Sequence, residues 1–147
     1  MHRFKYEGWR KLAGPLSQFV AERLVIEGLS ARCVIAVPLH PTRLRQRGFN
    51  QAELLAHELR KRLMVLEPVG ELVRTRPTPP QVGRDRLRRF DNVRDAFEWH
   101  GPQLGGEALL LIDDVATTGA TLDACAKALR DAGSGPVIGV SVARVTV

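Results

Sequence analysis

Cysteine and aromatic residues are scarce in this sequence. The 147 residues include two cysteines and an aromatic content of 5%. Cys33 and Cys125 lie far apart and lack the spacing of metal ligands or of a disulfide framework, so we expect both to be buried structural thiols. The low aromatic content argues against a surface that stacks the bases of single-stranded nucleic acid.

Long hydrophobic runs are also missing. No apolar stretch approaches the roughly 18 residues that a membrane span needs, and the N-terminus, MHRFKYEGWRK, has no apolar core like that of a signal peptide. We therefore expect a cytoplasmic protein without membrane insertion. A hydrophobic content of 44% and a charged content of 26% are ordinary for a globular protein, and the length predicts a single domain over residues 1–147.

Charge is unevenly distributed along the chain. Residues 1–94 hold 19 Lys and Arg against 9 Asp and Glu, whereas residues 95–147 hold 3 against 7. A basic first part indicates a polyanionic partner, which charge alone leaves open between nucleic acid and a phosphorylated small molecule.

Segments with helical and strand-like patterns alternate. We expect helices over residues 11–28, with Pro15 in a first turn, from Asn50 to about residue 64, with Glu53 completing a capping box, and over 118–132. The expected strands are 33–39, 70–74, 96–99, 107–113 and 136–145, and the expected loops are a basic one at 40–51 and an arginine- and proline-rich one at 75–95.

This alternation predicts the α/β class, with a mostly parallel twisted sheet flanked by helices. Ligands of such sheets bind beyond the carboxyl ends of the strands. The segments Pro38–Gln51 and Asp113–Thr121 both emerge there, so we expect the site between them.

The stretch LLLIDDVATTGAT, residues 109–121, is typical of a phosphate site. Its small residues form a strand-to-helix turn, where exposed backbone N–H groups and the helix dipole favour an anion. The candidate phosphate ligands are Ala116, Thr117, Thr118, Gly119, Ala120 and Thr121. The turn is not a Walker A loop, because GxxxxGK[ST] is absent.

The acid pair Asp113 and Asp114 needs a different partner, because carboxylates repel phosphate. The pair suits the vicinal hydroxyls of a ribose, or a divalent ion held through water. Alternatively, Asp114 caps the following helix and Asp113 is a solvated strand end, which leaves the threonine cluster unexplained.

This stretch resembles the phosphoribosyl pyrophosphate (PRPP) loop of type I phosphoribosyltransferases. Residues 37–56 and 74–99 further resemble the ComF/GntX branch, the competence-associated phosphoribosyltransferase-like proteins, in which RGFNQ (here Arg47–Gln51) and later Gln, Arg and Asn residues (here Gln81, Arg89 and Asn92) are characteristic. The resemblance covers roughly residues 2–145 and implies the type I phosphoribosyltransferase fold.

The resemblance implies a role for each part of the site. The 5-phosphate of PRPP would lie on Ala116–Thr121 and its ribose diol on Asp113 and Asp114, with Mg²⁺ arriving with PRPP and held by the acids only through water. Residues 76–92 would form a mobile flap that excludes water. The implied pyrophosphate-loop residues are Pro38, Leu39, His40, Arg43 and Arg47, and the implied flap residues are Gln81, Arg86, Arg89 and Asn92. His40 is not expected to be a catalytic base.

Two departures from the family pattern narrow these expectations. Family members usually carry an N-terminal cysteine-rich zinc module, which has no counterpart here, so no structural zinc is predicted. Purine-salvage relatives place an Asp at the position of Thr117 to exchange a proton with the purine, which argues against a purine acceptor handled in that way.

Two functions therefore compete. The first is PRPP-dependent phosphoribosyl transfer to an unknown acceptor with release of pyrophosphate. The second is a DNA-uptake factor that binds single-stranded DNA through its basic residues 1–94 and interacts with other proteins of the competence machinery. Family members often pair, so a homodimer is a further expectation.

Overall fold

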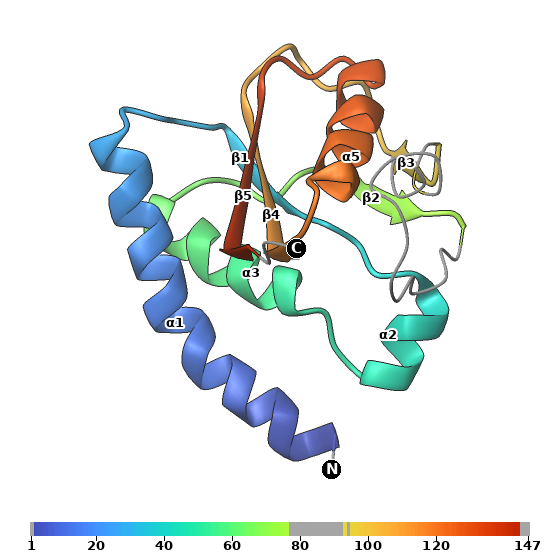
Figure 1. Ribbon diagram of the computed structural model, residues 1–147. Helices are drawn as coiled ribbons and strands as arrows, with labels where there is room; N and C mark the ends of the chain where they lie inside the picture. The colour runs from blue at the N-terminus through green and yellow to red at the C-terminus, as the bar shows by residue number, and fades with distance from the viewer. Residues whose placement is uncertain (1, 77–92, 94, 145–147) are drawn as a thin grey trace.

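The computed structural model describes residues 2–76, 93 and 95–144, and of residues 2–6 only the backbone. Figure 1 shows the order of its elements. The helices are α1 (His2–Ile26), α2 (Pro41–Arg47), α3 (Gln51–Leu63) and α5 (Ala120–Asp131). The strands are β1 (Cys33–Ala36), β2 (Glu71–Arg74), β3 (Phe97–His100), β4 (Leu109–Ala116) and β5 (Val137–Arg144).

A parallel sheet in the order β1-β4-β5 forms the centre of the fold, which confirms the predicted α/β class. Its central strand begins with four buried residues, Leu109–Ile112, whose side chains alternate between two hydrophobic clusters. One cluster contains α5, and the other contains α1 and α3 (Figure 1). A central strand covered on both faces explains the unbroken apolar run in the sequence.

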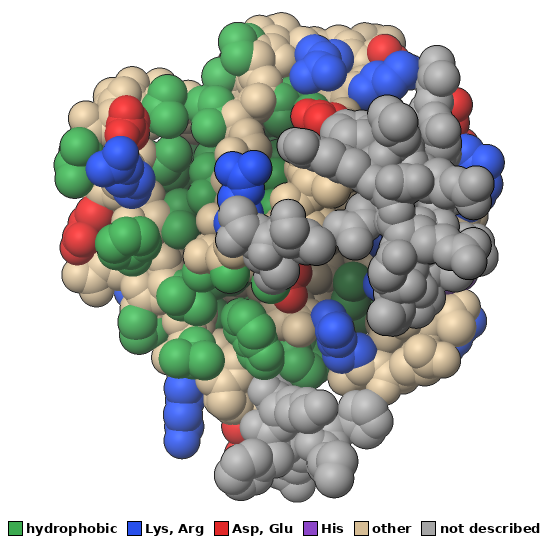
Figure 2. All heavy atoms as spheres, viewed as in Figure 1, with side chains coloured by type: hydrophobic (Ala, Val, Ile, Leu, Met, Phe, Trp, Pro, Cys, Tyr) green, Lys and Arg blue, Asp and Glu red, His purple; other side chains and the backbone are tan. Residues whose placement is uncertain are grey.

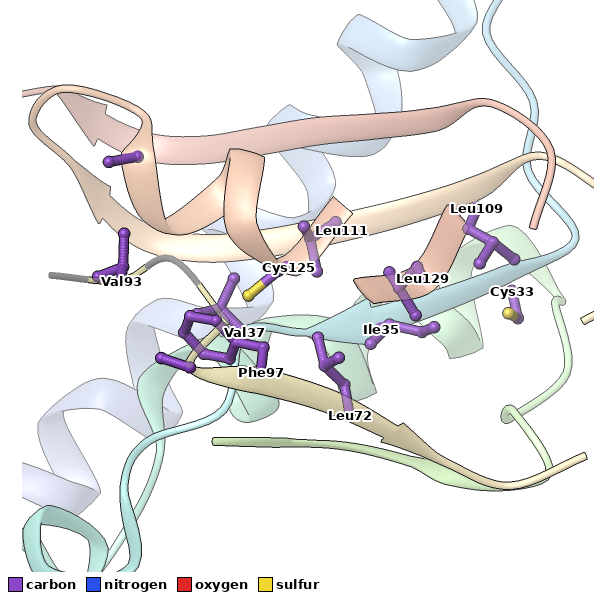
Figure 3. Packing of buried hydrophobic residues seen from close by; sticks show 12 residues of the cluster. Cys33, Ile35, Val37, Leu72, Val93, Phe97, Leu109, Leu111, Cys125 and Leu129 are labelled. Carbon is purple, nitrogen blue, oxygen red and sulfur yellow. The ribbon is translucent and has the colours of Figure 1, made fainter. Parts of the chain in front are cut away.

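The hydrophobic cluster that contains α5 extends to the carboxyl end of the parallel sheet. Figure 3 shows Cys125 and Leu129 of α5 among side chains of β1, β3 and β4. Cys125 and Cys33 are both buried, as predicted, and burial raises the pKa of each thiol above its ordinary value.

Helix α3 begins at the predicted cap, but the predicted capping box is wrong. The Asn50 side chain accepts a hydrogen bond from the backbone N–H of Ala52. The hydrogen bond to Glu53 comes from Arg60 Nη1, at 2.7 Å, rather than from the backbone of Asn50. Arg60 also donates from Nε to the carbonyl oxygen of Val34, so Glu53 serves a buried arginine beside β1.

The expectation of an uninterrupted loop over residues 40–51 is also wrong, because Pro41–Arg47 form α2. The Nδ1 atom of His40 accepts from the Thr42 backbone N–H at 3.3 Å, and Pro41 occupies the first helical position. Gly48, at φ 84°, ends the helix in the left-handed conformation. Arginine is a good helix former, so a basic composition was no reason to expect a loop.

Helix α1 is longer than predicted, and Pro15 lies inside it rather than in its first turn. Pro15 removes one backbone hydrogen bond of the helix. Side-chain hydrogen bonds form in the same helical turn. The Ser17 hydroxyl donates to the Gly14 carbonyl at 2.7 Å, and Arg62 of α3 donates to both residues. In the part of the chain that the structure describes, no helix is long and apolar enough to cross a membrane.

Strands β2 and β3, close to the predicted 70–74 and 96–99, pair with each other in an antiparallel sheet of two strands. Phe97 and Leu72 of this pair pack into the cluster beneath α5 (Figure 3). The pair thus brings Arg74, at the end of β2, to the carboxyl end of the main sheet.

Candidate functional site

The acid pair lies on the last half of β4, which runs to Ala116, further than the predicted end at 113. Each carboxylate accepts from the next backbone N–H: Asp114 N–H donates to Asp113 Oδ1, and Val115 N–H to Asp114 Oδ1, both at 2.9 Å. The residue that precedes α5 is Gly119, which makes no side-chain capping bond. The alternative that Asp114 caps this helix is therefore wrong.

The electrostatics of Asp113 are unusual. Burial, followed by the neighbouring Asp114, raises the pKa of Asp113 to about 7, while the positive charge of Arg74 opposes the rise. The raised pKa means that the charged form of Asp113 is disfavoured. A ligand that donates hydrogen bonds to this carboxylate, or carries positive charge beside it, would stabilise the charged form.

The phosphate turn, Ala116–Thr121, encloses a small polar cavity with Asp113. The volume of the cavity is about 40 Å³. Gly119 has φ 84°, a conformation that favours glycine, and it places the chain at the start of α5. The Ala120 N–H lies 3.4 Å from Thr118 Oγ1. Backbone N–H groups at the start of a 12-residue helix suit an anion, and the structure brings all six predicted phosphate ligands to this cavity.

The β1 turn, Val37–His40, follows the neighbouring strand. The Val37 N–H donates to the Ile112 carbonyl at 2.8 Å, which ties the start of the turn to the residue before Asp113. His40 caps α2 through Nδ1.

A wide groove of about 960 Å³, here called the α2–β2 groove, opens beside the β1 turn. Pro38, Leu39 and Arg47 of the predicted pyrophosphate loop line it, and Arg74 lines it from β2. Arg43 is half-buried, and its positive charge acts on Arg74.

Arg74 is a candidate ligand residue that the sequence analysis missed. It is 8% exposed, and its guanidinium lies 5.4 Å from the centre of the Phe97 ring. Burial first, and then Arg43, lowers the pKa of Arg74, while Asp113 opposes the change. Arg74 thus stands between the α2–β2 groove and the acid pair. Its place at the end of a predicted strand, just before the arginine-rich segment, was the available signal.

Gln81, Arg86, Arg89 and Asn92 of the predicted flap lie outside the described residues. Among the described residues, no three His, Cys, Asp or Glu side chains are grouped as a protein-only metal site would require.

Comparison with known proteins finds relatives named for DNA utilization and competence. The chain is 32% identical over 146 residues to the DNA utilization protein YhgH of Escherichia coli O157:H7, covering 93% of this chain and 62% of the relative. It is 34% identical over 102 residues to competence protein F of Haemophilus influenzae (68% and 44%), and 30% identical over 146 residues to competence protein ComFC of Streptococcus pneumoniae (97% and 60%). The chain thus spans about three fifths of the length of YhgH and ComFC.

A solved structure supports the fold independently. The chain is similar to hypoxanthine phosphoribosyltransferase of Trypanosoma cruzi, with a TM-score of 0.50 and 12% identity, covering 96% of this chain and 75% of that one. No protein-family model matches the sequence. The relatives and the fold together support a ComF-like protein with a phosphoribosyltransferase-type fold.

Proposed function

We propose that the protein binds PRPP and transfers its phosphoribosyl group to an acceptor, with release of pyrophosphate. The observation that carries the proposal is that Asp113 and the phosphate turn line one cavity. A ribose 5-phosphate needs an anion site and a hydrogen-bond acceptor for its diol at a fixed separation, and one strand-turn-helix unit offers both.

In this proposal the elements beside the acid pair receive the leaving group. With the ribose over Asp113 and Asp114, the pyrophosphate of PRPP extends toward the β1 turn and the arginines beside it, Arg43, Arg47 and Arg74. Their charges offset the charge that builds on pyrophosphate as its bond to the anomeric carbon breaks and that carbon becomes oxocarbenium-like.

The residues fit a Mg²⁺ ion that arrives with PRPP. The acid pair offers carboxylate oxygens, which suit an ion held through its water shell. When bound, Mg²⁺ would add positive charge at the pyrophosphate oxygens.

Titration of PRPP with Mg²⁺ into the protein tests this proposal. We expect saturable binding that weakens about a hundredfold or more in Asp113→Asn/Asp114→Asn, because two charge-assisted hydrogen-bond acceptors are lost at about 1.5–3 kcal/mol each. Asp131→Asn, an exposed carboxylate paired with Lys127, is the matched control and should bind like the wild type. An absence of heat from the wild-type protein, or equal binding by the double variant, would contradict the proposal.

The acceptor is the next question. Thr117 lies in the phosphate turn and cannot exchange a proton near neutral pH as an aspartate does. We therefore expect that a screen of nucleobases and amines for pyrophosphate release from PRPP will find no purine among the best acceptors. Preferential turnover of a purine would contradict this expectation.

DNA binding is a second candidate, favoured by the names of the relatives, which refer to DNA utilization and competence. Arg43, Arg45 and Arg47 concentrate positive charge on α2. On the face seen in Figure 2, outside the grey atoms, Lys and Arg are scattered rather than gathered in one band. If DNA lies along α2, affinity for a single-stranded oligonucleotide falls steeply with salt, and Arg45→Ala reduces that salt dependence. Equal affinity and salt slope in Arg45→Ala would remove α2 from the contact.

A further inference from the structure

The segment Arg47–Gln51 runs from the last residue of α2 to the first residue of α3, and its contacts are specific. Gly48 ends α2 at φ 84°, where its N–H donates to the Leu44 carbonyl at 2.7 Å. Phe49 is 8% exposed and anchors the connection in the interior. These two residues fix the direction in which the chain enters α3, and so the positions of the two side chains that follow.

Asn50 joins the β1 turn to α3. Its Nδ2 donates to the Val37 carbonyl at 3.0 Å, and its Oδ1 accepts from the Ala52 N–H at 3.1 Å. Since the Val37 N–H is bound to Ile112, Val37 is held from both sides, by β4 and by Asn50. Val37 therefore fixes the position at which the residues Pro38–His40 begin.

Gln51 acts on the arginine of the same segment. It is 7% exposed, and its Oε1 accepts from Arg47 Nη1 at 2.7 Å. Arg47 itself is an exposed residue that lines the α2–β2 groove. A buried acceptor thus restrains the guanidinium of Arg47, which lowers the entropy that Arg47 loses when it binds an anion.

We propose that Asn50 and Gln51 are positioning residues for the pyrophosphate half of the site, Asn50 through the β1 turn and Gln51 through Arg47. This inference rests on the proposed function, because it assigns the β1 turn and Arg47 to pyrophosphate. It goes further in separating the two halves: the phosphate turn is built within one strand-turn-helix unit, whereas the pyrophosphate half depends on side-chain bonds from the start of α3.

The separation gives a readout that a general loss of structure would not produce. Three probes are titrated: Mg²⁺-pyrophosphate, PRPP with Mg²⁺, and ribose 5-phosphate. Serine is a good helix cap and retains an oxygen for Ala52, but its side chain is too short to reach Val37. In Asn50→Ser we expect the affinity for pyrophosphate and PRPP to fall about tenfold, because a partly buried carbonyl loses its donor, and ribose 5-phosphate to bind within about twofold of wild type.

Asn50→Asp provides the comparison for charge. Aspartate keeps the cap but places a carboxylate oxygen against the Val37 carbonyl and adds a negative charge. It should lose at least as much pyrophosphate affinity as Asn50→Ser. Unfolding in urea, measured for each variant, shows whether α3 remains intact.

Gln51 has its own matched pair. Gln51→Met keeps the length of the side chain but removes the acceptor, and it should lower pyrophosphate affinity about fivefold, the loss of about one hydrogen bond. Gln51→Glu keeps an acceptor for Arg47 and should stay closer to wild type than Gln51→Met.

The outcomes separate the two proposals. If the wild-type protein binds all three probes but Asn50→Ser binds them equally well, the positioning role is wrong and the proposed function stands. If Asn50→Ser weakens ribose 5-phosphate as much as pyrophosphate, the effect is general and the positioning role is again wrong. If the wild-type protein binds none of the probes, the proposed function fails, and this inference with it.

Discussion

The two turns at the carboxyl end of the sheet are built in different ways. The phosphate turn after β4 uses local bonds: each acid accepts from the next residue, and Thr118 lies against Ala120. The β1 turn depends on a distant residue, because its first carbonyl is held by Asn50, 13 positions later. The strand before it is held in the same way, because the carbonyl of Val34 accepts from Arg60, 26 positions later.

Under the proposed function, the difference matches what each half of the site would require. A 5-phosphate can be held by backbone N–H groups and small side chains, which a single strand-turn-helix supplies. A pyrophosphate carries more charge and needs cationic side chains from several elements. The first half is therefore fixed by a short sequence, and the second by tertiary contacts.

Replacement of Arg74 should have the largest effect on ligand binding. Its charge acts on Arg43 beside the β1 turn and on Asp113 beside the phosphate turn. We expect Arg74→Met to lower PRPP affinity about a hundredfold, the loss of a charge-assisted contact of up to about 3 kcal/mol. The loss for ribose 5-phosphate should be much smaller. Calorimetric titration of both ligands measures this. Arg32→Met, an exposed arginine paired with Glu107, is the control, and equal losses for the two ligands would show that Arg74 does not discriminate between the halves.

Arg60 tests the long-range construction without touching the ligand. In Arg60→Met the Val34 carbonyl loses its donor, and Glu53 loses a bond to a buried cation. We expect the free energy of unfolding in urea to fall by about 2 kcal/mol. Arg23→Met, which removes an exposed pair with Glu27, should change it by less than about 0.5 kcal/mol. Similar values for the two variants would mean that Arg60 adds nothing beyond a surface charge.

Gly119 tests the local construction. Its φ is 84° and no atom lies within 4 Å of a Cβ built there, so Gly119→Ala carries a backbone penalty alone, about 1 kcal/mol of unfolding free energy. Ribose 5-phosphate affinity should fall as the turn relaxes, while pyrophosphate affinity should change little. Gly105→Ala, also in open space but without a positive φ, is the control in both assays. If Gly119→Ala has the unfolding free energy and the ribose 5-phosphate affinity of the wild type, the phosphate turn does not depend on its local backbone conformation.

The pH dependence of stability tests the environment of Asp113 alone. The pKa of Asp113 is about 7 in the folded protein and, in the unfolded chain, near the ordinary value of about 4. Between these values the folded state holds the extra proton, so this group's contribution to stability falls as pH rises from about 4 to 7 and is constant above. Asp113→Asn should remove this component from urea unfolding curves measured across the range. A wild-type minus variant difference that does not change with pH would exclude the shift.

Sequence reasoning located the turn after β4 but only part of the surroundings of the β1 turn. The strand, the acid pair and the turn are contiguous, so the phosphate site is predicted from residues 109–121 alone. Buried Leu55, Leu59 and Leu129 follow from helical periodicity. The bond from Asn50 to Val37 and the approach of Arg74 to Asp113 join residues that only the fold brings together, and no local pattern specifies them.

The most direct test of the central claim follows backbone amide resonances by NMR while ribose 5-phosphate is added. The account predicts saturable shifts concentrated at Ala116–Thr121 and at Asp113 and Asp114, with little change at the exposed end of α1 near Ile26. Shifts centred on the α2–β2 groove with the phosphate turn unaffected, or no saturable shifts at all, would contradict it.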